Sequence, residues 1–254
     1  MQFYTFELDE ESRAYTTIAT PFGLYRYKRL PMGICESPDI TQEIMEKVLE
    51  SLLDEIEIYL DDCAGFSDSW EAHCVLLRKL LTLLQDAGFA VNPLKCEWGV
   101  QETEFLGYLL TPDGLKPQAK KVAAIVNMQP PTNILELHSF LGLIGYYREM
   151  WPKCAHILAP LTALTGTKKF LWSDACTKAF KQIKAVVTVN ALLAYPNYNL
   201  PFDIETNASD YQLGAVIKQN GRPVAYYSRK LNAAQQNYTT IEKELLSIVE
   251  TLKF

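Results

Sequence analysis

The sequence predicts an α+β protein, with an antiparallel sheet and helices first, a helical segment next, and strands and a helix at the end. Residues 55–67 alternate apolar and polar side chains on both sides of an Asp-Asp pair, which is typical of a β-hairpin. Residues 117–194 instead carry apolar side chains at helical spacing, interrupted by prolines. Strand-like alternation returns from Leu200.

The elements before the hairpin are predicted from short local patterns. Residues 3–20 alternate loosely around the turn-like stretch DEESR, which predicts two antiparallel strands. A short strand is expected over residues 25–30. A helix then follows, with Ser37 as its cap and Pro38 in its first turn.

The elements after the hairpin continue the alternation of helices and strands. Asp68 or Ser69 is expected to cap a second amphipathic helix, which ends at Gly88. Residues 102–117 predict a strand, a turn over residues 112–114 and a returning strand. The resulting order, β-β-α-β-β-α-β-β, suits an antiparallel sheet with helices packed on one face.

The second half of the chain predicts four helices, then strands and a last helix. Turns at Asp210 and at Asn220-Gly221 divide the strands, and the Asn-Gly pair is a strong hairpin signal. The last helix begins near Thr239, and the domain that contains it is expected to be cut short. The four helices are expected over residues 118–128, 133–151, 154–166 and 173–190.

Composition indicates an ordinary globular protein of 254 residues, 48% hydrophobic and 21% charged. The chain has no apolar run long enough to span a membrane, and its acidic amino terminus lacks a signal-peptide core. We therefore expect a soluble, intracellular protein in the cytoplasm or nucleus, with no membrane partner. The six cysteines form no CxxC pair, so reduced thiols are expected rather than a zinc site.

Charge is distributed unevenly along the chain, whose net charge is −6. Residues 115–185 contain ten Lys or Arg against three Asp or Glu, a balance of +7, so the remainder carries −13. An acidic part that could hold metal ions thus accompanies a basic part that could bind phosphates. Alternatively, the basic helices only expose a solvated face.

Asp61 and Asp62 are the strongest candidates for chemistry in the hairpin. Two carboxylates side by side on a turn repel each other unless a cation neutralises them, and Mg²⁺ held by carboxylates serves in-line phosphoryl transfer. The alternative is that Asp is simply a good turn residue, and the dipeptide leaves both interpretations open. Gly33, just before a helix, could let the backbone approach a ligand closely or could be an ordinary loop glycine.

Longer motifs follow one another along almost the entire chain. They are TPFGLYRYKRLPMGICESPDITQ, YLDD, NPLKCEWGVQETEFLGYLLTPDGLKP, FLGLIGYYREMWP, LAPLTALT, FDIETNASDYQLGAVIKQNGRPVAYYSRKLN and YTTIEKELLSIV. In this order they resemble the polyprotein of gypsy-type long-terminal-repeat retrotransposons, a reverse transcriptase followed by the start of a ribonuclease H. The resemblance implies partial fingers and palm over residues 1–112, a helical thumb and connection over 113–194, and the first part of a ribonuclease H-like α/β domain over 195–254.

The resemblance also implies roles for single residues. Asp61 and Asp62 would be the catalytic aspartates that help hold two Mg²⁺ ions at the primer end, with Tyr59 in the same nucleotide site. Met32 and Gly33 would lie beside the incoming nucleotide. Lys95 would lie near the departing pyrophosphate, where a cation stabilises charge or donates a proton; an ordinary surface lysine remains the alternative.

Further roles concern nucleic acid and the last domain. Phe105, Leu106 and Gly107 resemble the hairpin that grips the primer, and the basic helices suit duplex phosphates. The implied partners are an RNA template, a DNA primer and deoxynucleoside triphosphates, with a homodimer or other parts of the polyprotein as further possibilities. Such enzymes work inside cytoplasmic virus-like particles. Glu244 matches the second acid of the ribonuclease H.

Three positions depart from the family pattern. A further catalytic aspartate normally lies on an LDL-like strand just upstream of the segment matching FYTFELDEES, whereas only two residues precede Phe3 here. Asn207 stands in TNAS, where the family has aspartate, and an amide oxygen brings no negative charge. Thr41 stands where an aromatic residue is usual. We therefore expect incomplete metal sites.

Functions of different classes remain open at this point. The first is an RNA-directed DNA polymerase that uses two-metal nucleotidyl transfer at YLDD, with an incomplete ribonuclease H-like domain attached. The second is a catalytically inactive retroelement remnant that at most binds nucleic acid through its basic helices. A purely protein-binding module is a third class, and no feature of the sequence favours it.

Overall fold

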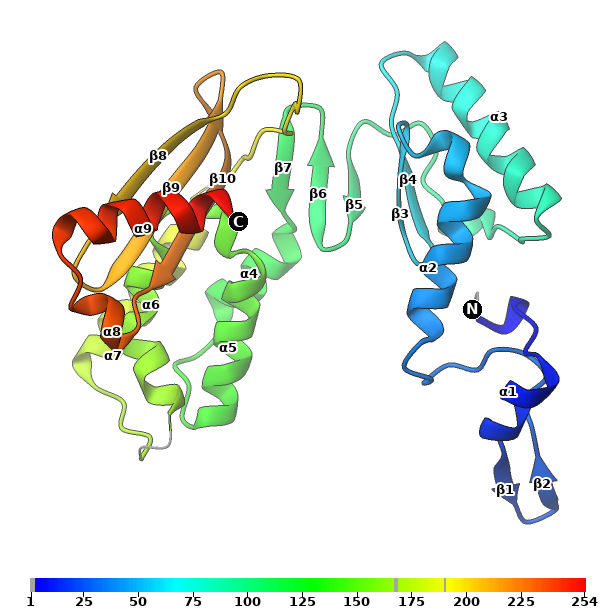
Figure 1. Ribbon diagram of the computed structural model, residues 1–254, viewed down its shortest axis with the longest axis horizontal. Coiled ribbons are helices and arrows are strands. Elements are labelled where there is room, and N and C mark those ends of the chain that lie inside the picture. Colours follow the sequence, from blue (N-terminus) through cyan, green and yellow to red (C-terminus); the bar gives the residue numbers. More distant parts are fainter. Residues whose placement is uncertain (1–2, 167–168, 190) are drawn as a thin grey trace. The chain divides into compact units, whose positions relative to one another are not determined.

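The computed structural model describes residues 3–166, 169–189 and 191–254. The chain forms two compact units, Met1–Val100 and Gln101–Phe254, and each is described separately (Figure 1). The expected mixture of antiparallel strands and helices is present in both units. Within the described residues, no helix has the length and apolar character needed to cross a membrane.

The first unit is built around the hairpin of β3 and β4, against which α2 and α3 pack. Its core consists of buried apolar side chains from α2, β3, α3 and the turn after α2, including Met45, Leu49, Ile56 and Leu76, with Cys63 of β4 partly buried against them. The elements are η1 Phe3–Thr5, α1 Glu10–Tyr15, β1 Ile18–Thr20, β2 Gly23–Tyr25, α2 Ser37–Val48, η2 Glu50–Leu52, β3 Ile56–Tyr59, β4 Asp62–Gly65, α3 Trp70–Asp86 and η3 Pro93–Lys95.

The expectation of two strands over residues 3–20 was wrong. The stretch taken for a turn is helix α1, because the Asp9 carboxylate accepts a hydrogen bond from Ser12 N at 2.9 Å and caps the helix. Only β1 is a strand there, and it pairs with β2. Ser37 is not the cap of α2 either: it lies in the first turn, where its hydroxyl donates to Pro31 O at 3.2 Å.

The second unit begins with an antiparallel sheet of three strands rather than the two expected over residues 102–117. The additional turn falls at Leu106 and Gly107, which both have positive φ. The strands are β5 Thr103–Phe105, β6 Tyr108–Thr111 and β7 Gly114–Pro117. Leu115 of β7 also pairs with Leu193 in an isolated antiparallel bridge.

Four helices then enclose the main core of this unit, close to the predicted ranges; the predicted end of the last one, position 190, lies outside the described residues. Phe140, Ile144, Tyr147, Trp151 and Phe180 are among the buried side chains. The elements are α4 Ala119–Asn127, α5 Ile134–Tyr146, η4 Arg148–Met150, α6 Cys154–Thr162, η5 Ala163–Thr165 and α7 Asp174–Val187.

The last strands form a second sheet in the order β10-β9-β8. Helix α9 lies across one side of this sheet and packs against β8 and β9 (Figure 1). The predicted Asn220-Gly221 turn joins β9 to β10, and Thr239 caps α9 as part of a capping box. These elements are β8 Asp203–Ala208, β9 Gln212–Gln219, β10 Arg222–Lys230, α8 Ala233–Gln236 and α9 Thr240–Leu252.

Candidate functional site

The paired aspartates lie where the predicted hairpin reverses direction. Tyr59 pairs with Asp62, so Leu60 and Asp61 form a two-residue turn and Asp62 begins β4. Leu60 has φ 55°, a backbone conformation that costs a residue other than glycine about 1–2 kcal/mol. The turn therefore needs support from outside the hairpin.

Gln42 of α2 supplies that support. Its side-chain Oε1 accepts a hydrogen bond from Leu60 N at 2.7 Å, and its Nε2 donates to Ile58 O at 3.1 Å. Nε2 also donates to Glu46 Oε1 at 2.8 Å, which fixes the amide orientation. One side chain thus holds the backbone on both sides of Tyr59, and it ties the position of the aspartates to a packed helix.

The two carboxylates are exposed and available. Within the described residues, neither Asp61 nor Asp62 forms a hydrogen bond or an ion pair through its side chain. Their charge acts on the next residue: burial first, and then Asp62 and Asp61, raise the pKa of the Cys63 thiol to about 11. Two unneutralised carboxylates this close suit a cation.

Two acidic groups, Asp61 and Asp62, contribute to this site in the described residues. No cluster of three or more His, Cys, Asp or Glu side chains suited to a metal ion occurs in the described part of the chain. The donor set nevertheless fits Mg²⁺, because this ion is commonly held by one or two carboxylates while substrate phosphates and water complete its octahedron.

Tyr59, Met32, Gly33 and Lys95 are placed in the same unit. Tyr59 and Met32 are 52% and 57% exposed. Gly33 has φ 96°, and no atom lies within 4 Å of the position a Cβ would take, so its backbone is open to a ligand. The loop that carries Met32 and Gly33 leads into α2, the helix that holds the hairpin.

Lys95 is the last residue of η3, and its side chain is exposed. Across the described ranges, its ammonium group has no protein partner. The adjacent thiol of Cys96 contributes to the raised pKa of Cys63, which places this segment within electrostatic reach of β4.

The candidate primer-binding residues lie in the second unit. Phe105 ends β5, and Leu106 and Gly107 form the turn to β6 with φ of 45° and 80°. The hydroxyls of Tyr146 and Tyr147, at the end of α5, donate to the carbonyls of Leu106 and Gly107. This turn is held by side chains at a helix end, whereas the turn beside Asp61 is held by Gln42 from within α2.

Asn207 lies on β8, and Glu244 lies on α9, the helix that packs against this strand. Ser247, one turn after Glu244 on α9, donates to Asn207 O at 3.2 Å and to Gly214 O at 3.3 Å. Both candidate side chains are exposed. Asp210 is not free to replace the missing aspartate, because Lys243 Nζ donates to its Oδ1 at 2.8 Å and thereby lowers the pKa of Asp210.

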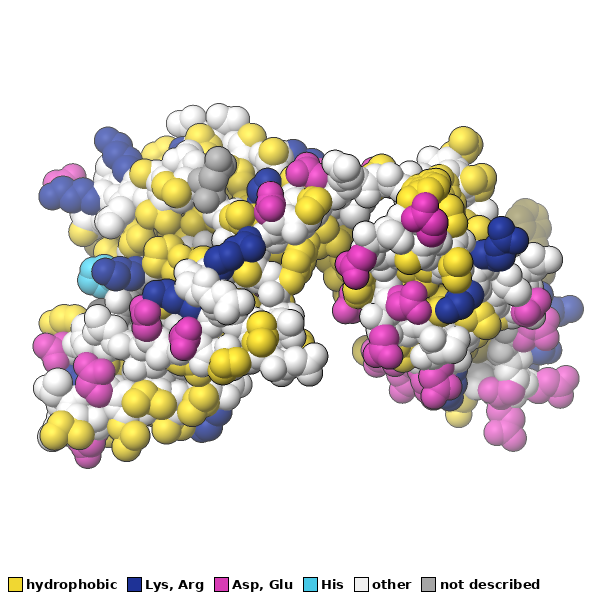
Figure 2. Space-filling model, turned by 90° about the horizontal axis from the view of Figure 1, so that it is seen from above, with side chains coloured by type: hydrophobic (Ala, Val, Ile, Leu, Met, Phe, Trp, Pro, Cys, Tyr) yellow, Lys and Arg dark blue, Asp and Glu magenta, His cyan; other side chains and the backbone are white. Residues whose placement is uncertain are grey.

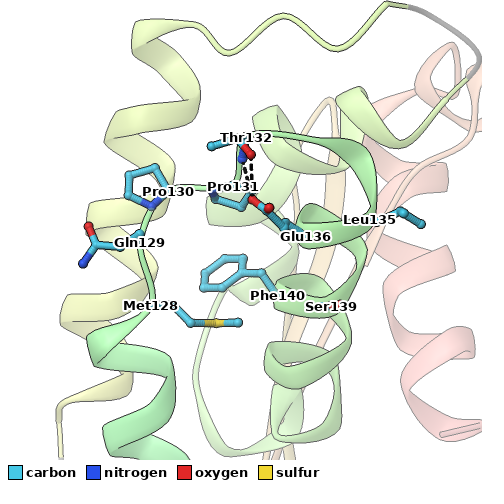
Figure 3. A pocket seen from close by; sticks show the side chains of 9 residues that line it. All are labelled: Met128, Gln129, Pro130, Pro131, Thr132, Leu135, Glu136, Ser139 and Phe140. Atoms are coloured by element: carbon cyan, nitrogen blue, oxygen red, sulfur yellow. Dashed lines mark hydrogen bonds between the residues drawn. The ribbon is translucent and has the colours of Figure 1, made fainter.

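One hollow of the second unit is remote in sequence from all these candidates. It has a volume of ≈ 490 Å³ and lies beside the loop of Pro130 and Pro131 (Figure 3). Its charged residue, Glu136, accepts hydrogen bonds from Thr132 N at 2.8 Å and Thr132 Oγ1 at 3.0 Å. The carboxylate caps α5 in this way, so the hollow presents no unpaired charge to a ligand.

Sequence reasoning missed the side chains that position the site. Gln42 was visible only as the residue after Thr41, and the two tyrosines only as part of the motif FLGLIGYYREMWP. Their roles depend on contacts with residues 16 to 40 positions away, and no local pattern reports such contacts.

Comparison with known proteins agrees with these features. Residues 2–110 match the family described as reverse transcriptase (RNA-dependent DNA polymerase), and residues 172–254 match the RNase H-like domain found in reverse transcriptase. Solved structures of the foamy viral protease-reverse transcriptase, in complex with an RNA/DNA hybrid and with dsDNA, share the fold. Their TM-scores are 0.91 and 0.89 at 24% identity, with 98% and 99% of this chain and 35% and 54% of those chains covered.

The chain therefore contains a reverse transcriptase domain and a ribonuclease H-like domain. The curated proteins to which it is similar include Pol polyproteins of gypsy-type retrotransposons. The Pol polyprotein from transposon 297 of Drosophila melanogaster is 39% identical over 254 residues, and that from transposon gypsy of the same species is 32% identical over 264. These alignments cover 99% and 98% of this chain, which spans about a quarter of those relatives, 24% and 26%.

The predicted family and fold class are confirmed by these comparisons. The predicted boundaries at residues 112 and 194 stay predictions. The compact units divide between Val100 and Gln101, and the ribonuclease H-like match begins at residue 172. Reverse transcriptases and RNase H-like domains generally depend on divalent metal ions, which agrees with the expectation of Mg²⁺ at the family level.

Proposed function

We propose that this chain carries the nucleotidyl-transfer site of a retrotransposon reverse transcriptase, with Asp61 and Asp62 as ligands of Mg²⁺. The observation that supports this role is a pair of exposed carboxylates on a turn whose backbone Gln42 holds, with no protein partner among the residues that the structure describes. When Mg²⁺ is bound there, the chemistry it supplies is neutralisation of phosphate charge and activation of the primer hydroxyl.

The remaining residues of the first unit suit the substrates of that reaction. The open backbone at Gly33 and the exposed Met32 would accept the incoming deoxynucleoside triphosphate next to Tyr59. The exposed ammonium of Lys95, which has no partner in the described part of the chain, would stabilise the charge of the departing pyrophosphate. The primer would be held by the backbone of Phe105, Leu106 and Gly107.

Charge supports a nucleic-acid partner for the second unit. Residues 1–100 carry eight Lys or Arg against eighteen Asp or Glu, whereas residues 101–254 carry sixteen against twelve. Acidic side chains are prominent on the first unit in the view of Figure 2. The related foamy viral enzyme was solved with an RNA/DNA hybrid, and we infer an RNA template and a DNA primer for this chain.

Fewer features support catalysis by the ribonuclease H-like domain. Asn207 lies beside the helix that carries Glu244, but it contributes no negative charge. We also propose that the chain pairs with a second copy or with other parts of the polyprotein. Its proposed location is in cytoplasmic particles or in the nucleus. No contact in the described residues favours the alternative of an inactive remnant, and primer extension decides between the two.

The experiment is primer extension on an RNA template with Mg²⁺. Replacing Asp61 or Asp62 by Asn should lower the rate at least about hundredfold, because the site loses one of two metal ligands. Asp86→Asn, an exposed change at the end of α3, is the matched control and should leave the rate unchanged.

A version with an LDL-like strand added upstream separates the remaining outcomes. Extension by this version alone means that the palm is correctly built and needs that strand. Extension that survives Asp62→Asn would refute the proposed metal site. Duplex binding without extension in any version would support the remnant.

A further inference from the structure

The turn between β5 and β6 has a conformation that its sequence does not favour. Positive φ at both central residues, 45° at Leu106 and 80° at Gly107, is the pattern of a type I′ turn. Such turns prefer Asn-Gly, because a branched apolar side chain is disfavoured at positive φ. Leu106 is also 37% exposed, so its own burial does not explain the conformation.

Two neighbouring tyrosines compensate by binding both carbonyls of the turn. The hydroxyl of Tyr146 donates a short hydrogen bond to Leu106 O. The hydroxyl of Tyr147 donates to Gly107 O at 2.5 Å. These tyrosines lie 40 residues away, where α5 ends, and Tyr147 is almost fully buried in the core of the unit.

Packing around this contact favours glycine at position 107 and an aromatic ring at position 146. A Cβ at Gly107 would lie 3.0 Å from the hydroxyl oxygen of Tyr146 and 3.1 Å from its ring. The ring of Tyr108 stacks on that of Tyr146 with centroids 5.5 Å apart, and its hydroxyl donates to Tyr146 O at 3.1 Å. Burial raises the pKa of Tyr108 to about 12 and also raises that of Tyr147, so both hydroxyls keep their protons at neutral pH.

We propose that Tyr146 and Tyr147 are positioning residues that hold the Leu106-Gly107 turn in the conformation that receives the primer end. The inference rests on the proposed function, because the contact of this turn with the primer is part of that proposal. What the inference adds is that two hydroxyl groups at the end of α5 determine the backbone conformation of the primer-binding turn. The tyrosines themselves need not touch nucleic acid.

The test compares Tyr146→Phe, Tyr147→Phe and the double variant with Tyr195→Phe. Tyr195 is a matched control, because its hydroxyl donates to Gly114 O at 3.4 Å, at the other hairpin turn of the same sheet. Hydrogen exchange of the amides of residues 106–108 reports the turn directly. A primer with 2-aminopurine at its 3′ end, annealed to an RNA template, reports the primer terminus when the chain binds the duplex.

In the double variant we expect exchange at residues 106–108 to become roughly tenfold faster, because two hydrogen bonds to the turn are lost. The fluorescence of the terminal 2-aminopurine should also change, while duplex affinity changes less than about threefold because phosphate contacts dominate it. Tyr195→Phe should alter neither signal. Adding Leu106→Asn to the double variant should restore slow exchange, because Asn-Gly favours this turn intrinsically; general destabilisation would not be corrected in this way.

Several results would overturn the inference. Unchanged exchange at residues 106–108 would show that the tyrosines do not hold the turn. Faster exchange with an unchanged fluorescence signal on bound duplex would show that the turn does not position the primer end, while nucleic-acid binding stands. Failure of the unaltered chain to bind duplex would refute the proposed function, and the positioning role with it. If the double variant does not fold, the same measurements on Tyr146→Phe alone test the inference. Tyr146 is the exposed member of the pair, so this change does not alter the core.

Discussion

At the scale of single residues, the proposed metal site depends on an amide that never touches the metal. Gln42 accepts from Leu60 N and donates to Ile58 O, because its amide carries an acceptor and a donor on adjacent atoms. The hairpin turn has a positive φ at Leu60, so it would relax toward commoner conformations without these bonds. Relaxation would move Asp61, which shares the turn.

Replacing Gln42 by Met should therefore lower the free energy of unfolding by about 1–3 kcal/mol, the contribution of two hydrogen bonds to the backbone. The Leu60 amide should also exchange faster. Urea unfolding and hydrogen exchange measure the two effects. Gln85→Met, an exposed change on α3, is the control. Equal losses in the two variants would show that the amide does not support the turn.

At the scale of elements, helices were predictable wherever their ends carry a local signal. Ser69 and Thr239 were expected at helix starts and are observed as caps, because capping needs only residues two or three positions apart. The same signal was overlooked at Asp9, where weak alternation favoured strands. Asp61 and Asp62 could be proposed as site residues from sequence alone, and their role stays a prediction. The side chains that hold the two turns could not be proposed, because those contacts arise only in the folded chain.

The hairpin of β6 and β7 offers a test at this scale. Gly114 has φ 140°, and a Cβ there would lie 2.1 Å from Leu193 O, the carbonyl that accepts from Leu115 N. Gly221 has φ 75°, but nothing lies within 4 Å of its Cβ position. Changing Gly221 to Ala adds backbone strain alone, whereas changing Gly114 to Ala also disrupts the bridge to Leu193.

We expect Gly221→Ala to cost about 1–2 kcal/mol of unfolding free energy and Gly114→Ala about 2–5 kcal/mol, the excess being steric overlap. Urea unfolding followed by far-ultraviolet circular dichroism measures both. Each variant serves as the control for the other, because each places the same methyl group on a hairpin glycine. A loss at Gly221 as large as that at Gly114 would contradict the steric explanation.

At the scale of the whole molecule, the two units differ in the charge that they offer to a polyanion. The excess of acidic residues lies in residues 1–100, and the excess of basic residues lies in residues 101–254. Lys121, Lys178 and Lys181 are exposed lysines of α4 and α7 without a protein partner among the described residues. They are available to duplex phosphates.

Changing these three lysines to Gln should weaken duplex binding and make its salt dependence shallower. Each lysine that contacts a phosphate contributes about 0.9 to the slope of log K against log salt, so the slope should fall by up to about 2.7. Binding titrations from 50 to 200 mM salt measure it. The control changes Arg78 and Lys79 of α3 to Gln, which removes exposed positive charge from the acidic unit. A larger change of slope in the control would place the nucleic-acid contacts of this chain on its first unit instead.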